Sequence, residues 1–267
     1  MSFISSRHNA EIKEIISLRD KKTRKEKGKC IVEGWRLLKD AWKSGVYIYK
    51  VYISKSLWEK KDKELKEFLN SISYSVVDDS LMNKLSLLET PPGILGVLPL
   101  FLEPKWDVLI NNKNYIAIYS DGIQDPGNLG TLIRISEGLY ADALILSEDT
   151  VDPYNYKVIR ASSGSIFRLP IWIASYKEIL EFFKGHRVVI ADPKGEKIYF
   201  QYNFRESFLL ILGNEAWGVR EELYSPLNPI KLRIPLKETV ESLNVAIAGS
   251  AFLFEAQKQR LMEGNRL

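Results

Sequence analysis

Six short apolar runs between residues 115 and 234 constrain the fold of this chain more than any other feature of its sequence. Apolar and polar residues do not alternate along these runs, as they would in a sheet with one face in water. Continuous apolar strands are typical of a sheet that is buried on both faces. The predicted strands are 115–119, 143–146, 171–174, 188–191, 208–212 and 232–234.

Helical segments fall between these strands, and the alternation predicts an open, mostly parallel α/β sheet. The predicted helices are 129–139, 154–167, 176–184, 219–224 and 243–261. Ligands bind such sheets at the carboxyl ends of the strands. Three polar loops follow predicted strands: SDGIQDPGNLG, GNEAWG and PLKETVESLN. We expect these loops to meet at one sheet edge and to bind a nucleotide-like ligand.

The residues before this region predict a smaller α/β domain. Its expected strands are 30–32, 46–54, 74–77 and 94–98, and its expected helices are 36–44, 57–70 and 79–88. The predicted organisation is a basic helix or arm over 1–29, a small domain over 30–99, a linker over 100–113 and a large domain over 114–267.

Basic residues are concentrated at the start of the chain. Residues 1–29 contain nine Lys or Arg and four Asp or Glu, while the net charge of the whole chain is only +4. A basic segment on a nearly neutral body fits the binding of nucleic-acid phosphates, and it also fits a solvated helix face.

Several protein classes are excluded by composition. One Cys and two His cannot build a disulfide framework or a zinc site of these residues, so no metal is expected. The longest uncharged apolar run, 244–254, has about half of the roughly 20 residues that span a bilayer. The first residues lack a signal-peptide pattern, so we expect a cytoplasmic protein without a membrane partner.

The loops do not contain the common phosphate-binding or hydrolase motifs GxGxxG, GxxxxGK[ST] and GxSxG. Gly130 and Arg134 are four residues apart, so both lie on one helix face, and the Arg134 side chain leans toward the helix start. This Arg either reaches a ligand there or lies exposed to solvent. Glu215 and Ser242 are candidate helix N-caps.

Three blocks, in this order, resemble the motifs of the SpoU (TrmH) family of RNA 2′-O-ribose methyltransferases. They are Asn128-x-Gly130-x-x-x-Arg134, Leu212-Gly213-x-Glu215-x-x-Gly218, and Ile234-Pro235-Leu236 followed by Ser242-Leu243-Asn244-Val245. Residues 157–165 resemble a further family stretch, and the N-terminal third is similar to the family's substrate-binding domain of the L30e type. The chain departs from the pattern at Ala246, where many relatives have Ser, and at Leu236, where Met is frequent.

The resemblance implies an S-adenosylmethionine-dependent RNA (ribose-2′-O-)methyltransferase. Its C-terminal parallel sheet would contain a deep trefoil knot, its C-terminal domain would form a homodimer, and its substrate would be ribosomal RNA rather than transfer RNA. The implied catalytic residues are Arg134, Asn128, Glu215 and Asn244. The implied cofactor contacts are Leu212, Gly213, Glu215, Gly218, Ile234, Leu236, Ser242, Leu243 and Asn244. The expected RNA contacts are Lys21, Lys22, Arg24, Lys25 and Arg160.

Two alternatives stay open. A base methyltransferase of the same knotted fold would modify a nitrogen of guanine or uracil, and a non-catalytic RNA-binding protein would keep the fold without the reaction.

The resemblance also implies a role for Arg134, because the arginine at this place is often described as a base in the family. A guanidinium, however, keeps its proton at neutral pH. Our hypothesis is that Arg134 instead clamps the adjacent phosphate and stabilises the developing alkoxide.

Overall fold

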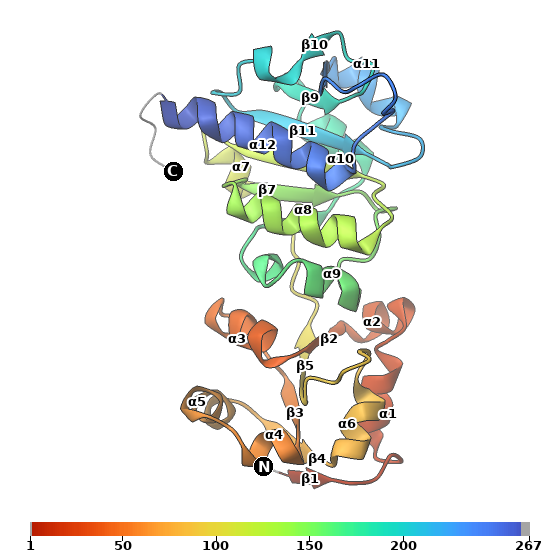
Figure 1. Cartoon of the computed structure of the whole chain (residues 1–267), viewed down its shortest axis with the longest axis vertical. Coiled ribbons are helices and arrows are strands. Elements are labelled where there is room, and N and C mark those ends of the chain that lie inside the picture. Colours follow the sequence, from red (N-terminus) through yellow and green to blue (C-terminus); the bar gives the residue numbers. More distant parts are fainter. Residues whose placement is uncertain (1, 263–267) are drawn as a thin grey trace. The chain divides into compact units, whose positions relative to one another are not determined.

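The computed structural model describes residues 2–262, which form two compact units, each with a sheet of its own (Figure 1). The first unit runs up to Phe101 and includes residues 154–160, and the second comprises residues 102–153 and the chain from Ala161 onward. The predicted functional boundaries of an arm, a small domain, a linker and a large domain stay predictions.

The first unit contains a five-stranded mixed sheet. Its order is β1 (Ser2–Ile4), β4 (Tyr74–Val77), β3 (Lys50–Ser54), β5 (Ile94–Pro99) and β2 (Lys29–Glu33). Strands β1, β4 and β3 run parallel to one another, and β5 is antiparallel to both β3 and β2. The sequence did not predict β1, because this strand has three residues and exists through its pairing with the distant β4.

Helices cover both faces of this sheet. On one face, α1 (Ala10–Ser17) and α6 (Asp79–Leu85) pack with side chains of β3 and β5 in one buried cluster. On the other face lie α3 (Trp35–Lys43) and α5 (Lys63–Ser71), where the ring of Phe68 contacts Trp35 and Trp42 at centroid distances of 5.0 and 5.3 Å. The unit also contains α2 (Lys21–Lys27), α4 (Lys55–Glu59) and most of α9 (Tyr156–Ala161).

The predicted helix 57–70 is wrong as one continuous element. Helix α4 ends at Glu59 and α5 begins at Lys63. The side chain of Asp62 accepts a hydrogen bond from the backbone N–H of Leu65 at 2.8 Å, which starts a new helix at this point. The predicted helix 154–167 is also interrupted, because Ser163 and Gly164 have positive φ angles of 53° and 90°.

The second unit contains seven parallel strands, which confirms the predicted parallel sheet. The order is β10 (Lys197–Ile198), β12 (Ile230–Arg233), β9 (Val188–Ala191), β11 (Phe208–Gly213), β6 (Ile116–Asp121), β7 (Ala143–Leu146) and β8 (Ile171–Ile173). The sequence did not predict β10, which has only two residues. The knot implied by the resemblance stays a prediction.

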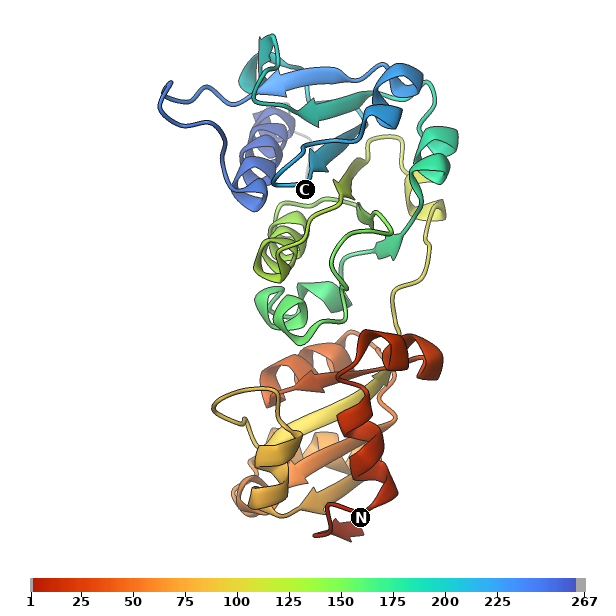
Figure 2. The same ribbon diagram turned by 90° about the vertical axis from the view of Figure 1, so that its right-hand side faces the viewer.

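Both faces of this sheet are covered by helices (Figure 2). Helices α8 (Pro126–Gly138) and α12 (Val245–Met262) pack against each other on one face. Helices α7 (Asp107–Ile110), α10 (Tyr176–Phe182) and α11 (Tyr224–Leu227) lie on the other face. Three short 3₁₀ turns complete the unit: 165–167, 199–201 and 221–223.

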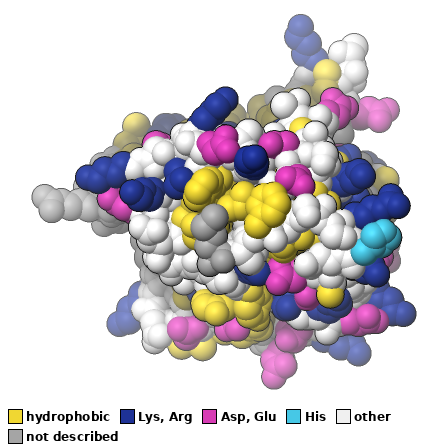
Figure 3. Space-filling view, turned by 90° about the horizontal axis from the view of Figure 1, so that it is seen from below, with side chains coloured by type: hydrophobic (Ala, Val, Ile, Leu, Met, Phe, Trp, Pro, Cys, Tyr) yellow, Lys and Arg dark blue, Asp and Glu magenta, His cyan; other side chains and the backbone are white. Residues whose placement is uncertain are grey.

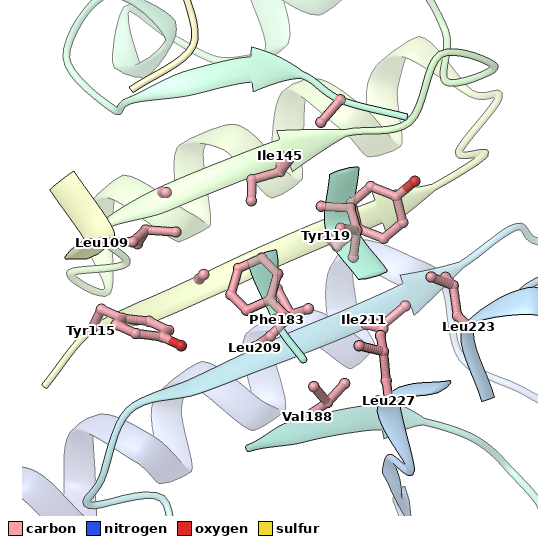
Figure 4. Packing of buried hydrophobic residues seen from close by; sticks show 14 of the residues in the cluster. Leu109, Tyr115, Tyr119, Ile145, Phe183, Val188, Leu209, Ile211, Leu223 and Leu227 are labelled. Atoms are coloured by element: carbon pink, nitrogen blue, oxygen red, sulfur yellow. The ribbon is translucent and has the colours of Figure 1, made fainter. Parts of the chain in front are cut away.

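Burial on both faces explains why the strands show no alternation in sequence. Tyr115, just before β6, and Tyr119, within it, belong to the cluster around Phe183, drawn in Figure 4. Ile116 and Ile118 alternate with them along the strand and are also fully buried, so they face the opposite layer. Water reaches neither face of β6.

The direction of chain progression reverses between β6 and β11. The chain moves outward from β6 to β7 and β8, whereas β11, β9 and β12 lie on the other side of β6. The register pairs Gly213 with Asp121, so the loops after β11 and β6 begin side by side. Open α/β sheets bind ligands at such a switch point.

Candidate active site

A cavity of about 780 Å³ lies at the carboxyl ends of β9, β11 and β12. Its wall consists of residues 192–194 after β9, residues 213–219 after β11, and residues 234, 236 and 241–245 after β12. The volume falls within the range of about 300–1,000 Å³ that is typical of sites for small ligands. The apolar side chains of Ile190, Leu232 and Phe252 add to the wall.

The structure brings all of the predicted cofactor contacts to this cavity. They are Leu212, Gly213, Glu215, Gly218, Ile234, Leu236, Ser242, Leu243 and Asn244. Two separate segments supply them, one at the end of β11 and one after β12, and these segments meet only because the parallel strands end at one sheet edge. Their role in cofactor binding stays a prediction.

The loop after β11 is closed by a close approach of two glycines. Asn214 and Gly218 exchange two backbone hydrogen bonds, of 2.8 and 3.0 Å. A Cβ atom placed on Gly213 would lie 2.3 Å from the carbonyl carbon of Gly218 and 2.5 Å from the backbone nitrogen of Val219. Only glycine therefore fits at position 213 in this loop.

Three predicted catalytic residues form one chain of hydrogen bonds. The Asn244 amide donates to the Asn128 Oδ1 at 2.6 Å, and the Asn128 amide donates to the Glu215 Oε1 at 2.9 Å. Asn128 lies in the first turn of α8, Glu215 in the loop after β11 and Asn244 just before α12, so this relay joins the first predicted motif to the second and the third. The relay fixes the loops that surround the cavity relative to one another.

Two predicted helix caps are wrong. Helix α12 begins at Val245, and the Asn244 Oδ1 accepts from the backbone N–H groups of Ala246 and Ile247, so Asn244 takes the place predicted for Ser242. Glu215 caps no helix, because its carboxylate accepts from the Asn128 amide and from the backbone N–H of Gln124 at 3.3 Å.

Arg134 is separate from the relay. Its side chain is exposed on α8, and no hydrogen bond or ion pair within residues 2–262 holds its guanidinium. Gly130, one turn earlier on the same face, is buried. The charge of Arg134 is therefore open both to solvent and to a ligand over the start of α8, and its catalytic role stays a prediction.

An ion pair that the sequence did not predict lies beside these loops. The Arg220 side chain donates to the buried Asp121 carboxylate at 2.5 Å and to Asp149 at 2.9 Å, and the Arg220 backbone N–H donates to Asp121 at 2.8 Å. Burial raises the pKa of Asp121, and the hydrogen bonds from Arg220 oppose that rise. Burial also disfavours the charged Arg220, but the hydrogen bond and charge of Asp121 outweigh it and raise the Arg220 pKa.

Asn214 is a second missed residue. Its amide donates to the carbonyl oxygen of Gly122 at 2.6 Å and so ties the loop after β11 to the loop after β6. A signal was present in the sequence, because Asn214 lies between the predicted Gly213 and Glu215. Asp121 carried no such signal, since it ends an apolar strand.

The predicted RNA contacts on α2 separate into two kinds. Lys21, Lys22 and Lys25 are exposed. Arg24 is buried, and its guanidinium donates to the carbonyl oxygens of Leu18 and Arg19 at 2.9 and 2.7 Å. Arg24 therefore stabilises the junction of α1 and α2 in this structure, and we expect phosphate contacts from the three lysines instead.

Arg160, the fifth predicted RNA contact, lies exposed on α9.

Figure 3 looks onto the end of the first unit that carries β1, where hydrophobic side chains gather in the middle and charges of both signs surround them. This end has no uniform charge, so its appearance does not mark it as a phosphate-binding face.

Within residues 2–262 there is no group of three or more His, Cys, Asp or Glu side chains that could hold a metal ion. Among the helices of the same residues, none combines the length and the apolar character that a membrane span requires.

Comparison with known families matches both parts of the chain. Residues 115–254 match the SpoU rRNA Methylase family, and residues 9–96 match the MRM3-like substrate binding domain. The first match spans the strands and loops that form the cavity and the relay.

Characterised relatives are similar to the chain over nearly its whole length. The 23S rRNA (guanosine(2553)-2′-O)-methyltransferase RlmP of Bacillus subtilis is 29% identical over 257 residues, covering 95% of this chain and 98% of that protein. A 23S rRNA (uridine(2479)-2′-O)-methyltransferase of Streptomyces viridochromogenes is 28% identical, covering 92% and 88%. The crystal structure of an AdoMet-bound rRNA methyltransferase from Sinorhizobium meliloti superimposes with a TM-score of 0.84 at 27% identity, covering 96% and 97%.

Proposed function

This chain belongs to the SpoU rRNA methylase family, and we infer that it methylates a ribose 2′-hydroxyl of ribosomal RNA with S-adenosylmethionine as the methyl donor. The observation that carries this inference is that the second and third motif segments line one cavity, while hydrogen bonds through Asn128 join the first motif to both of them.

The cavity suits this donor. Its apolar wall of Leu212, Leu243 and Phe252 fits a purine ring, and its backbone-lined loop at Gly213 lets a ligand approach closely. When bound, S-adenosylmethionine supplies an electrophilic methyl group on a sulfonium sulfur. The relay of Asn128, Glu215 and Asn244 would hold the surrounding loops in place, so that the acceptor oxygen meets this methyl group in line.

Arg134 would bind the RNA and would not remove the proton of the ribose 2′-hydroxyl. In the reaction the ribose oxygen forms a bond to the methyl carbon, the bond from that carbon to sulfur breaks, and the hydroxyl proton is released. A guanidinium cannot accept that proton at neutral pH. We propose that Arg134 holds the neighbouring phosphate and stabilises negative charge on the ribose oxygen, while the proton passes to phosphate or water.

Alkaline hydrolysis tests the position of the methyl group. RNA that the protein has modified should contain a linkage that resists alkali, because cleavage needs a free 2′-hydroxyl. A methyl group found on a base, with every linkage still cleaved by alkali, would indicate a base methyltransferase. RNA binding without binding of S-adenosylmethionine would indicate a non-catalytic RNA-binding protein.

The lysines of α2 should contribute to RNA affinity. Replacing Lys21, Lys22 and Lys25 with Gln is expected to weaken RNA binding and to flatten its salt dependence, by up to about 0.7–0.9 in the log–log slope per lost phosphate contact. The measurement is RNA affinity by fluorescence anisotropy across a salt series.

A matched control removes the same charge from another part of the first unit, by replacing the exposed Lys60, Lys63 and Lys66 with Gln. The control should change the slope less than the α2 variant does. If both variants change the slope equally, α2 contributes only through the net charge of the protein. If the slope of the α2 variant is unchanged, α2 does not contact the RNA.

We propose that the protein is a homodimer that associates through its C-terminal domain. The support is an apolar stripe on α12: Ile247, Phe254 and Leu261 are spaced seven residues apart, and each is 49–61% exposed. A second copy would remove this stripe from water. Light scattering should give twice the chain mass of 30.7 kDa, and a monomer mass at micromolar concentration would contradict the proposal.

We also propose that the enzyme acts in the cytoplasm, where its ribosomal RNA substrate would be found.

A further inference from the structure

We propose that Trp217 is the stacking platform for the nucleobase of the nucleotide whose ribose is methylated. This inference rests on the proposed function and adds a nucleobase-binding subsite to the same site. RNA is recognised in large part by stacking unpaired bases on aromatic side chains. An exposed indole beside a ribose methylation centre is suited to that task.

Trp217 is exposed and yet firmly held. It is 52% exposed, although it lies in the closed loop between Gly213 and Gly218. The Asn214 side chain accepts hydrogen bonds from the backbone N–H groups of Ala216 and Trp217, at 2.7 and 3.3 Å. An exposed aromatic residue on a fixed backbone has little conformational entropy to lose when a base stacks on it.

The indole has a defined resting place on the neighbouring loop. Gly122 follows β6 with a φ of +78°, and a Cβ atom placed there would lie 2.8 Å from Cζ2 and 3.0 Å from Cη2 of Trp217. Only glycine at position 122 leaves room for the ring. The ring edge is therefore fixed over the loop after β6, while about half of the residue remains open to solvent.

The position of Trp217 favours the acceptor nucleotide over the methyl donor. Trp217 belongs to the wall of the cavity, but Gly122, on which its ring rests, does not. Strand β11 lies between β9 on the cavity side and β6, from which the chain enters α8 with Asn128 and Arg134. The indole thus stands at the boundary between the donor cavity and the helix whose arginine we assign to the RNA.

Substitution of Trp217 should separate RNA binding from donor binding. With an unmodified 23S ribosomal RNA transcript as the probe, Trp217→Ala is expected to raise the KM for RNA about 5- to 140-fold, which corresponds to the loss of one base–aromatic stack. The dissociation constant for S-adenosylmethionine should change much less than the KM for RNA, although Trp217 also borders the cavity. Trp217→Phe should recover most of the loss, because a phenyl ring still stacks.

Phe200→Ala is the matched control, since Phe200 is an exposed aromatic residue of the same unit that does not line the cavity. It should leave the KM for RNA unchanged. The melting temperature of each variant shows whether the loop still folds. If Trp217→Ala unfolds the protein, Trp217→Phe and Trp217→Leu provide the comparison, because both fill the space over Gly122 and only Phe stacks.

Fluorescence gives a readout that a purely structural role would not change. The chain has six tryptophans, and we expect RNA to quench the wild-type emission more strongly than that of Trp217→Phe.

Two results for Trp217→Ala would overturn the inference. Weaker donor binding with an unchanged KM for RNA would place the ring on the donor, and unchanged values of both would leave the ring without a role in binding. If the wild type neither binds nor methylates the transcript, the proposed function fails and this inference falls with it. A wild type that methylates RNA while Trp217 has no effect overturns the inference alone.

Discussion

Replacing Arg134 with Ala is expected to lower kcat by about 10²–10³-fold, the loss typical of one charged or hydrogen-bonding group that stabilises a developing oxyanion. The affinity for S-adenosylmethionine should not change, because Arg134 does not line the donor cavity. Single-turnover rates at saturating RNA and donor measure this effect on the chemical step itself.

Arg134→Lys distinguishes the two accounts of this residue. A positive charge that stabilises phosphate and alkoxide is partly replaced by an ammonium, so the Lys variant should retain measurable activity. Arg187→Ala is the control, since Arg187 belongs to the same unit and pairs with Glu206 away from the donor cavity. If the Lys variant binds both ligands and has no turnover, a charge account is inadequate, and geometry or true base chemistry must be invoked.

Gly213→Ala should weaken donor binding and lower the methylation rate by about 100-fold. The added methyl carbon would lie 2.3–2.5 Å from backbone atoms of Gly218 and Val219, and backbone cannot yield as the end of a flexible side chain does. The loop after β11 must then open, and a displacement of about 1 Å near a reaction centre can cost about 100-fold. Calorimetric titration with S-adenosylmethionine measures the loss, and the melting temperature reports the strain.

Gly138→Ala is the corresponding control, because Gly138 ends α8 and a Cβ atom there would meet no heavy atom within 4 Å. It should bind the donor normally and be no less stable, since Ala favours a helix over Gly. Normal donor binding by Gly213→Ala would show that the close approach of the two loop strands does not shape the donor site.

Much of the second unit could be predicted because its strands are buried on both faces. A run such as Phe208–Gly213 identifies itself as a buried strand within a few residues. The helical segments between such runs then predict that the strands are parallel. The elements that the sequence did not predict depend on pairing with a distant strand or on a helix cap. The short β1 and β10 exist through pairing, and the break before α5 depends on a single carboxylate, that of Asp62.

The candidate site shows the same division. Spacing and family resemblance identified the residues of the three motifs; the structure places those of the second and third around one cavity and bonds Asn128 of the first to both. Neither source indicated that Asn244 would bond to Asn128 or that Arg220 would pair with the buried Asp121. These contacts depend on the strand order, which places β11 next to β6, and short-range patterns do not specify it. Trp217 was also missed, because an isolated aromatic residue in a loop carries no periodic signal.

The most direct test of the proposed function is the transfer of an isotope-labelled methyl group. The purified protein is incubated with methyl-labelled S-adenosylmethionine and unmodified ribosomal RNA, and the RNA is digested to nucleosides and analysed by mass spectrometry. We predict label in a single kind of 2′-O-methylnucleoside, and an initial labelling rate about 100-fold lower, or lower still, when Arg134→Ala replaces the wild type. Label on a base, or no label from a wild-type protein that binds the donor and the RNA, would contradict ribose methylation of this RNA.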